Sequence, residues 1–468
     1  MSEIFAELDA ACQAFAQQEN IPGLVAGIVQ GGRLAHVTTV GLADIEAARR
    51  VEPATAFRIA SMTKNMMALA VLSLRDQGRL SLDAPLGEYV PQFASVRPAT
   101  RDSRPVSLRD LLSHMAGFVT DDPWGDRVLG MTPAELDSMI ATGHLFARPP
   151  GVAFEYSNLG YALVGRALTN VSGEPYQSFI RRTILKPLGM HATTFDPSEA
   201  MKGDYAFGYR LDEGQWSRER IEPDGEVGAM GGLVTTVPDY ARYVAFLLSA
   251  WPARDDEEQG PVRRSSVREM GQWHAPPFAI ERLAGRPPLA TAYGSGLMSS
   301  ADPRLGRWLH HSGGLPGYGS HVLMLPDRGR GVFAFGNRTY AQMSRLTIRL
   351  ADMLHDADSQ RPVTPPSTVL TRAVEAFVAA YAAGRIEVAE PVLAVNFLLD
   401  MPARLRDKEL AALKQRLGEG RLELIEPVHA LAGRFALICA HGRLRGTITL
   451  SPDAAPGIQK LVLVAEDA

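Results

Sequence analysis

Residues 57–72 read FRIASMTKNMMALAVL, an apolar run at helical spacing that opens with Ser61 and Lys64. Positions three apart share one face of a helix, so the Lys64 amine can reach the Ser61 hydroxyl. Backbone N–H groups at a helix N-terminus favour the negative charge of an attacking serine. Desolvation lowers the pKa of a lysine, and a neutral lysine can take the serine proton. The alternative is a serine cap followed by a solvated lysine.

The second polar group is Tyr156-Ser157-Asn158, within PPGVAFEYSNLGYALVG (149–165). A tyrosine hydroxyl moves protons when a nearby cation stabilises its anion. The Asn158 amide can donate to a substrate carbonyl and accept a hydrogen bond from Lys64. The alternative is a tyrosine packed at a helix start, with Asn158 as the helix cap.

The third polar group is His311-Ser312-Gly313-Gly314, which precedes the segment Leu315-Pro316-Gly317. Glycines in a strand let a substrate approach the backbone, and a backbone N–H there can join that of Ser61 to hold an oxyanion. His311 can bind or polarise the substrate, or contribute charge when protonated. The alternative is a glycine-rich turn beside a surface histidine.

Apolar segments predict strands in both end regions of a catalytic domain that spans residues 1–358. Runs 23–30 and 33–40 flank a Gly-Gly pair and predict a hairpin, and 321–336 predicts two strands around a polar turn. We expect an α/β (α+β) fold whose mainly antiparallel sheet joins the N- and C-terminal parts around a large helical insertion. The expected helices are 2–18, 64–77, 107–115, 174–186, 238–250 and 340–355.

Two polar stretches divide the rest of the chain. The proline- and arginine-rich residues 251–288 predict an exposed excursion, and 359–367 predicts a Pro-rich linker. Residues 368–468 predict a small α+β accessory domain, with helices near 368–384 and 403–417 followed by four strands. This order loosely resembles the NTF2-like group.

Composition narrows the class of protein. The length of 468 residues fits one large domain and a smaller one. A net charge of −4 without a basic run argues against a nucleic-acid partner, and no run reaches the ~18 apolar residues of a membrane span. The opening stretch carries early acids and no basic segment before an apolar core, so we expect a cytoplasmic protein. Cys12 and Cys439 are expected to be packed thiols.

Other catalytic frameworks lack support in the sequence. No Gly-x-Ser-x-Gly elbow occurs, so the sequence does not favour an α/β-hydrolase. His310 and His311 are adjacent and lack a His-Glu-x-x-His frame, so we expect no zinc site. His114, which lies between leucines and Ala116-Gly117, is expected to be structural.

The order and spacing of the three polar groups resemble the serine β-lactamase and penicillin-binding protein superfamily. The resemblance is greatest to its branch of class C β-lactamases, D-aminopeptidases, DD-carboxypeptidases and family VIII esterases. It implies an acyl-enzyme mechanism without metal or cofactor. Four further segments carry it: SLRDLLSHMAGF (107–118), ILKPLGMHATTF (184–195), GAMGGLVTTVPDYARYVAFLL (228–248) and HSGGLPGYGSHVLMLPD (311–327).

The resemblance also implies a role for each polar group. Ser61 would be the acylated nucleophile, with Lys64 and Tyr156 as proton carriers and Asn158 as polar support. The backbone N–H groups of Ser61 and Gly314 would form the oxyanion hole. The other residues of the third group would bind the substrate, namely His311, Ser312 and Gly313.

The third group departs from the β-lactamases, which usually carry Lys-Thr-Gly where this chain has His311-Ser312-Gly313. A lysine suits a substrate carboxylate, whereas a histidine is mostly neutral near pH 7. We expect hydrolysis of a small ester or amide. The sequence supports D-amino-acid peptidase or DD-carboxypeptidase activity almost as well, and it supports weak β-lactamase activity less. A catalytically silent binding protein of the same fold is the rival class. The expected partner is a small-molecule ester or peptide, and a homodimer is an open alternative.

Overall fold

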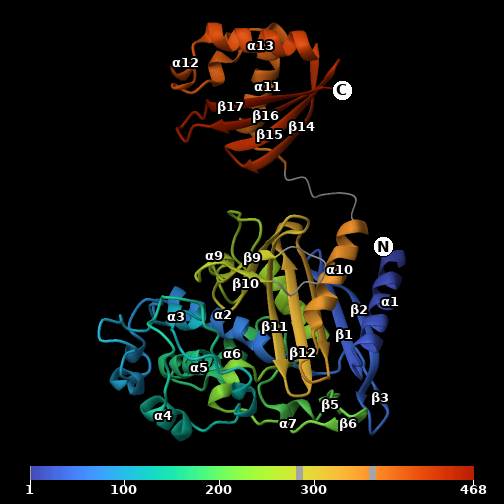
Figure 1. Cartoon of the computed structure of the whole chain (residues 1–468), viewed down its shortest axis with the longest axis vertical. Helices are drawn as coiled ribbons and strands as arrows, with labels where there is room; N and C mark the ends of the chain where they lie inside the picture. Colours follow the sequence, from blue (N-terminus) through green and yellow to red (C-terminus); the bar gives the residue numbers. More distant parts are fainter. Residues whose placement is uncertain (1, 281–287, 358–364, 468) are drawn as a thin grey trace. The chain divides into compact units, whose positions relative to one another are not determined.

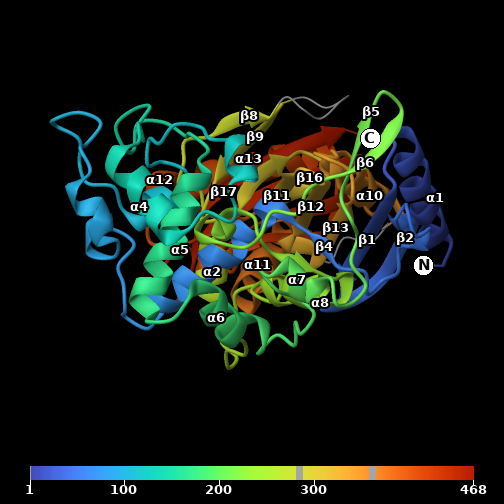
Figure 2. The same cartoon turned by 90° about the horizontal axis from the view of Figure 1, so that it is seen from below.

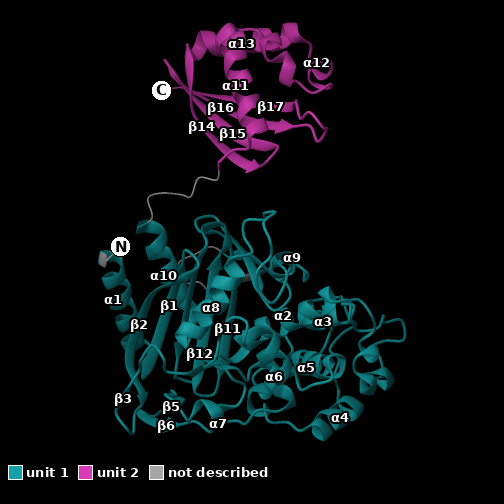
Figure 3. Ribbon diagram, turned by 180° about the vertical axis from the view of Figure 1, so that it is seen from behind, with its two compact units in different colours: residues 1–359 teal, residues 360–468 magenta. Residues whose placement is uncertain are grey.

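The chain forms two compact units, residues 1–359 and 360–468 (Figure 3). The computed structural model describes residues 2–280, 288–357 and 365–467. Most of the expected linker at 359–367 therefore lies outside the described residues. Each unit is described by itself below.

A nine-stranded antiparallel sheet organises unit 1, in the order β3-β2-β1-β13-β12-β11-β10-β9-β8. The hairpin of β1 (Gly23–Gln30) and β2 (Arg33–Asp44) pairs with β13 (Arg330–Gly336), so Ala26 lies opposite Ala334. The expected joining of the N- and C-terminal parts in one sheet is confirmed. The remaining strands are β3 (Arg49–Arg50), β8 (Phe278–Ile280), β9 (Leu289–Tyr293), β10 (Met298–Asp302), β11 (Gly306–Leu315) and β12 (Tyr318–Leu325).

Helices cover both faces of the sheet because its central strands are apolar on both sides. On one face, α1 (Ser2–Gln18) and α10 (Met343–Ala357) pack against buried residues such as Leu323 and Val332. On the other face, α2 (Thr63–Asp76) and α8 (Val237–Leu248) share a core with Leu309, Val322 and Phe333.

The helical insertion lies beside the sheet, with α2 between the two in both views (Figures 1 and 2). Two antiparallel strand pairs accompany it: β4 (Phe57–Arg58) with β7 (Val234–Thr235), and β5 (Tyr209–Asp212) with β6 (Gln215–Arg218). Its helices are α3 (Leu108–Leu112), α4 (Pro133–Thr142), α5 (Asn158–Ser172), α6 (Tyr176–Ile180) and α7 (Pro197–Ala200).

The polar stretch 251–288 is predicted to be an exposed excursion, and this prediction is wrong for part of it. The stretch contains α9 (Arg264–Glu269) and β8, which is an edge strand of the large sheet. Val267 and Met270 are three positions apart and share one helix face, so both reach the core and are only 2% and 0% exposed. The surrounding charged residues mask this short apolar signal.

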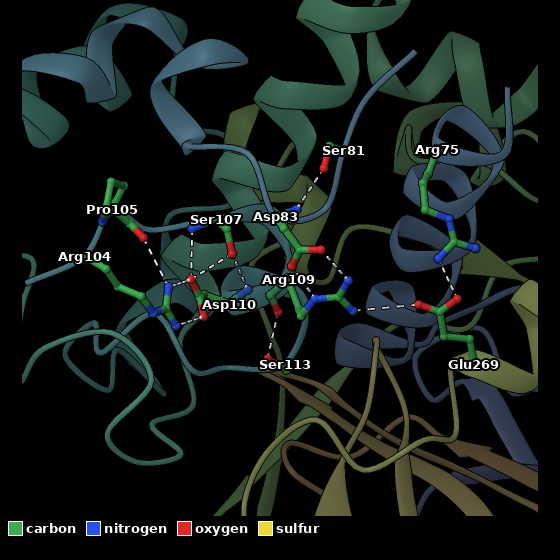
Figure 4. Close-up of polar contacts among 10 residues, drawn as sticks. All are labelled: Arg75, Ser81, Asp83, Arg104, Pro105, Ser107, Arg109, Asp110, Ser113 and Glu269. Carbon is green, nitrogen blue, oxygen red and sulfur yellow. Dashed lines mark hydrogen bonds and ion pairs between the residues drawn. The ribbon is translucent and has the colours of Figure 1, made fainter. Parts of the chain in front are cut away.

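Helix α3 positions the segment that carries Tyr156. The Ser107 hydroxyl accepts a hydrogen bond from the Asp110 N–H, while the Asp110 carboxylate accepts from the Ser107 N–H, which makes a capping box. Arg104 donates to both Asp110 oxygens at 2.6 and 2.7 Å (Figure 4). The segment after α3 then receives a backbone hydrogen bond, from the Glu155 N–H to the His114 carbonyl.

Replacing Ser107 with alanine should lower the free energy of unfolding of unit 1 by about 1 kcal/mol, because the helix loses its N-cap acceptor. Urea unfolding of the whole chain measures this change. Ser95→Ala, at an exposed position, is the matched control and should change stability by less than about 0.5 kcal/mol. Equal stability of the two variants would contradict the capping role.

Unit 2 is an α+β module whose sheet is an antiparallel meander in the order β14-β15-β16-β17. Its core contains Phe377 and Tyr381 of α11 together with Phe435 and Leu444 of the sheet. The NTF2-like resemblance stays a prediction. The elements are α11 (Thr368–Ala383), α12 (Phe397–Asp400), α13 (Ala403–Leu417), β14 (Gly420–His429), β15 (Ala432–Cys439), β16 (Gly442–Leu450) and β17 (Ile458–Asp467).

Candidate active site

Ser61 lies in a 3₁₀ turn, Ala60–Met62, that runs directly into α2. This turn lies close against the sheet. The Ser320 hydroxyl of β12 donates to the Ile59 carbonyl at 2.7 Å, and a Cβ at Gly313 of β11 would lie 2.3 Å from the same oxygen. Only glycine therefore fits at position 313, and β11 approaches Ser61 closely.

The Lys64 side chain is fully buried, and its amine lies between three oxygen atoms. Nζ is 2.9 Å from Ser61 Oγ, 2.9 Å from Asn158 Oδ1 and 2.8 Å from the Met230 carbonyl oxygen. The structure thus brings together the first polar group and the asparagine of the second. It also adds a backbone carbonyl that the sequence does not single out.

Burial lowers the pKa of Lys64 from 10.5 to about 7. Three carboxylates oppose this shift, those of Asp122, Asp126 and Asp121, because they favour the charged ammonium. Near neutral pH a substantial fraction of the amine is therefore uncharged. A neutral amine at this distance can accept the Ser61 proton.

Tyr156 lies partly buried beside Lys64, whose Nζ is 4.9 Å from the centre of its ring. Burial raises the pKa of Tyr156 well above 10, and a side-chain hydrogen bond with Ser61 opposes that rise. The His114 ring packs against the Tyr156 ring with centroids 4.3 Å apart, and Nδ1 of His114 accepts from the Ser157 N–H at 3.1 Å. His114 thus supports the tyrosine from behind, in keeping with a structural role.

Asn158 is the first residue of α5, and Ser157 is the N-cap of that helix. The Asp121 carboxylate accepts from the backbone N–H groups of Asn158 and Leu159 at 2.6 and 2.7 Å, so the helix start is fixed without the Asn158 side chain. The amide Nδ2 of Asn158 has no hydrogen-bond partner within the described ranges. Asn158 is only 1% exposed, so this donor is buried as well as unpartnered.

His311 lies beneath the site and is only 2% exposed. Its Nε2 is 2.7 Å from the Tyr293 hydroxyl and its Nδ1 is 2.6 Å from the Ser312 carbonyl oxygen. Burial and the nearby Lys64 lower the pKa of His311 to about 3, although the hydrogen bond to Ser312 favours the charged form. The ring is neutral at physiological pH, and both nitrogens are engaged, so it offers a substrate neither a charge nor a free ring nitrogen.

Ser312, Gly313 and Gly314 are among the residues that line a cavity of about 710 Å³, and so is Tyr156. Strand β10 pairs with residues Gly306 to His310 of β11. Beyond His310, the edge of β11 that faces away from β12 has no strand neighbour in the part that the structure describes. The backbone of Ser312–Gly314 is therefore open to a ligand. Tyr340 closes one end of this opening, since its ring lies 2.9 Å from a Cβ built at Gly314.

The structure adds three residues near the site that sequence reasoning missed. Tyr293 binds His311, and Tyr340 donates to the Asp126 carboxylate at 2.9 Å. Burial, together with the charge of Asp122, raises the pKa of Asp126 to about 7. Sequence spacing gives no signal for these contacts, because each joins segments that only the fold brings together. Among the described residues, no group of three or more His, Cys, Asp and Glu side chains is arranged to hold a metal ion.

The chain matches the family described as Beta-lactamase over residues 8–356, and it belongs to this family. The resemblance to the serine β-lactamase and penicillin-binding protein superfamily is therefore confirmed. No helix within the described ranges is both long enough and apolar enough to cross a membrane.

The chain is similar to three further proteins. Protein flp of Staphylococcus aureus (strain NCTC 8325 / PS 47) is 26% identical over 345 residues, which are 74% of this chain and 65% of that protein. The D-alanyl-D-alanine-carboxypeptidase/endopeptidase AmpH of Escherichia coli K12 is 27% identical over 320 residues, 66% of this chain and 78% of AmpH. The octameric penicillin-binding protein homologue from Pyrococcus abyssi shares the fold, with a TM-score of 0.64, 22% identity and 98% coverage of both chains.

The burial of Lys64 predicts how the reactivity of Ser61 depends on pH. Because a neutral Lys64 takes the serine proton, labelling of Ser61 by a fluorophosphonate should accelerate as pH rises through about 7. Asp122→Asn removes a negative charge that favours the ammonium, so its acceleration should occur at lower pH. Mass spectrometry of the Ser61 peptide after timed labelling measures both profiles.

Asp255→Asn is the matched control, because it removes an exposed carboxylate from a loop outside the site. Its labelling profile should coincide with that of the wild-type chain. If Asp122→Asn also coincided with the wild type, the charge coupling between Asp122 and Lys64 would be refuted.

Proposed function

We propose that the chain is a serine hydrolase that forms an acyl-enzyme on Ser61 and hydrolyses a small ester or amide. The observation that carries the proposal is the 2.9 Å contact between the buried Lys64 amine and the Ser61 hydroxyl. Membership of the Beta-lactamase family supports it. A catalytically silent binding protein would have no need for a buried amine with a lowered pKa at a serine.

In the proposed acylation, neutral Lys64 takes the Ser61 proton while Oγ bonds to the substrate carbonyl carbon. The carbonyl oxygen becomes an oxyanion, held by the backbone N–H groups of Ser61 and Gly314. Tyr156 gives its proton to the leaving oxygen or nitrogen as that bond breaks. The Lys64 ammonium then returns a proton to the Tyr156 phenolate, which lies beside it.

Deacylation repeats these transfers with water in place of the leaving group. Water gives a proton to the Tyr156 and Lys64 pair as its oxygen bonds to the acyl carbon. The bond to Ser61 breaks, the serine recovers a proton, and the free acid departs. Asn158 would act as polar support for the site through its contact with Lys64.

The third polar group, residues 311–314, favours an uncharged substrate rather than a penicillin-like acid. His311 is buried and neutral where β-lactamases usually carry a lysine, so it supplies no cation for a substrate carboxylate. In our proposal, Ser312 and Gly313 contact the substrate while His311 supports the strand from below. Weak β-lactamase activity ranks behind esterase and amidase activity for this reason.

A D-amino-acid peptidase resembling the DD-carboxypeptidases is the second candidate function. The similarity to AmpH, whose name records D-alanyl-D-alanine-carboxypeptidase and endopeptidase activity, favours it. The same catalytic groups would serve, since an amide differs from an ester only in its leaving atom. A purified chain offered p-nitrophenyl butyrate, D-alanyl anilide and nitrocefin would separate the three activities.

We also propose a cytoplasmic location and self-association. Self-association is supported by the solved homologue from Pyrococcus abyssi, which is described as octameric. Light scattering coupled to size exclusion would separate a monomer from a homodimer or a larger assembly.

Replacing Ser61 with alanine should reduce turnover of p-nitrophenyl butyrate by at least about a thousandfold, because no nucleophile remains to be acylated. Fluorophosphonate labelling of the same peptide should vanish. Ser198→Ala, at an exposed serine outside the site, should keep both signals. Full activity of Ser61→Ala would sink the assignment.

A further inference from the structure

The 710 Å³ cavity extends beyond the candidate site along one face of the sheet. Its walls include two pairs of residues that lie opposite each other on β10 and β11. These pairs are Met298 with His310 and Ser300 with Trp308. Residues directly opposite in an antiparallel pair point to the same face. Ile348 of α10 closes the far side, so the cavity lies on the face that carries α10.

The cavity shares only part of the candidate site. Tyr156, Ser312, Gly313 and Gly314 are among its lining residues, whereas Ser61, Lys64 and Asn158 are not. In the proposed mechanism Tyr156 hands its proton to the departing atom. The part of the substrate that extends past Tyr156 into the cavity is therefore the leaving group, and the acyl group lies on the Asn158 side.

The interior offers mainly apolar surface. Trp308 stacks on His310 with ring centroids 5.0 Å apart, and Phe278 and Leu289 add apolar walls. Aromatic side chains present large apolar faces, so this lining favours a ligand that carries an aromatic ring.

The polar groups around the cavity carry little net charge. His310 Nε2 lies 2.9 Å from the Ser300 hydroxyl, and burial lowers the pKa of His310 to about 4, so its ring is neutral. His321 is buried, and burial lowers its pKa well below 6.5. Arg345 at the rim is paired with Glu19 at 2.6 Å. A charged leaving group would find no free counter-ion among these residues.

We propose that this cavity is a leaving-group pocket for a large, neutral, aromatic alcohol or amine. The inference rests on the proposed function. It defines the substrate as an aryl or arylalkyl ester, or the matching amide, of a small acid. The Ser61 Oγ–acyl bond forms, the bond from acyl carbon to the leaving oxygen or nitrogen breaks, and Tyr156 supplies the proton. The volume falls within the usual range of pockets for drug-sized ligands.

The test compares 2-naphthyl acetate with methyl acetate, which form the same acetyl-enzyme and differ only in the leaving group. Ile348→Trp fills the cavity and should lower the ratio of kcat/KM for the naphthyl ester to that for the methyl ester by at least about tenfold. Ser344→Trp fills the cavity from a less buried position and serves as the second variant if Ile348→Trp does not fold. It should lower the same ratio. Arg349→Trp, on the exposed side of α10, is the matched control and should keep the wild-type ratio.

The outcomes separate this inference from the proposed function. If neither acetate is hydrolysed and Ser61 is not labelled by fluorophosphonate, the proposed function fails and the pocket assignment fails with it. If both esters turn over through Ser61 but the filling variants leave the ratio unchanged, only the leaving-group pocket is overturned. A loss that follows the length of the acyl chain in p-nitrophenyl esters would instead assign the cavity to the acid.

Discussion

The site depends on keeping one amine out of water. A fully buried lysine loses its hydration, and this loss must be offset by partners at fixed distances. Lys64 finds them on three separate segments: Ser61 before α2, Asn158 at the start of α5, and the carbonyl of Met230. The same burial that requires these partners lowers the pKa of the amine into the range where it can act as a base. The packing of these three segments and the basicity of the amine are therefore linked through one desolvated group.

Much of the fold and part of the site could be predicted from sequence, because their signals are local or repeat in a fixed order. The i, i+3 spacing of Ser61 and Lys64 gives their contact directly, since helix geometry brings such positions together. The apolar runs at the two ends of the domain give the antiparallel sheet. The Ser107 cap and the α+β character of unit 2 were readable for the same reason.

What escaped prediction depends on contacts between distant segments. His311 reads as a substrate ligand by its place in the third polar group, yet Tyr293 from β9 occupies one ring nitrogen, and the neighbouring carbonyl occupies the other. The Met230 carbonyl is a backbone atom that no side-chain pattern reports. Val267 and Met270 reach the core from a stretch whose charged neighbours suggest a surface loop. In each case tertiary packing, rather than local propensity, decides the outcome.

The alternating side chains of strand β11 face two different regions of unit 1. Successive side chains of a strand point to opposite faces, so Leu309, His311 and Gly313 face the helical side that carries Ser61, while Trp308 and His310 face the cavity beside α10. Alternate positions of a single strand can therefore diverge independently during evolution. In the proposed function, one set would be constrained by the reacting groups, and the other would be free to change which leaving groups fit. A one-residue insertion in this strand would exchange the two sets and damage both.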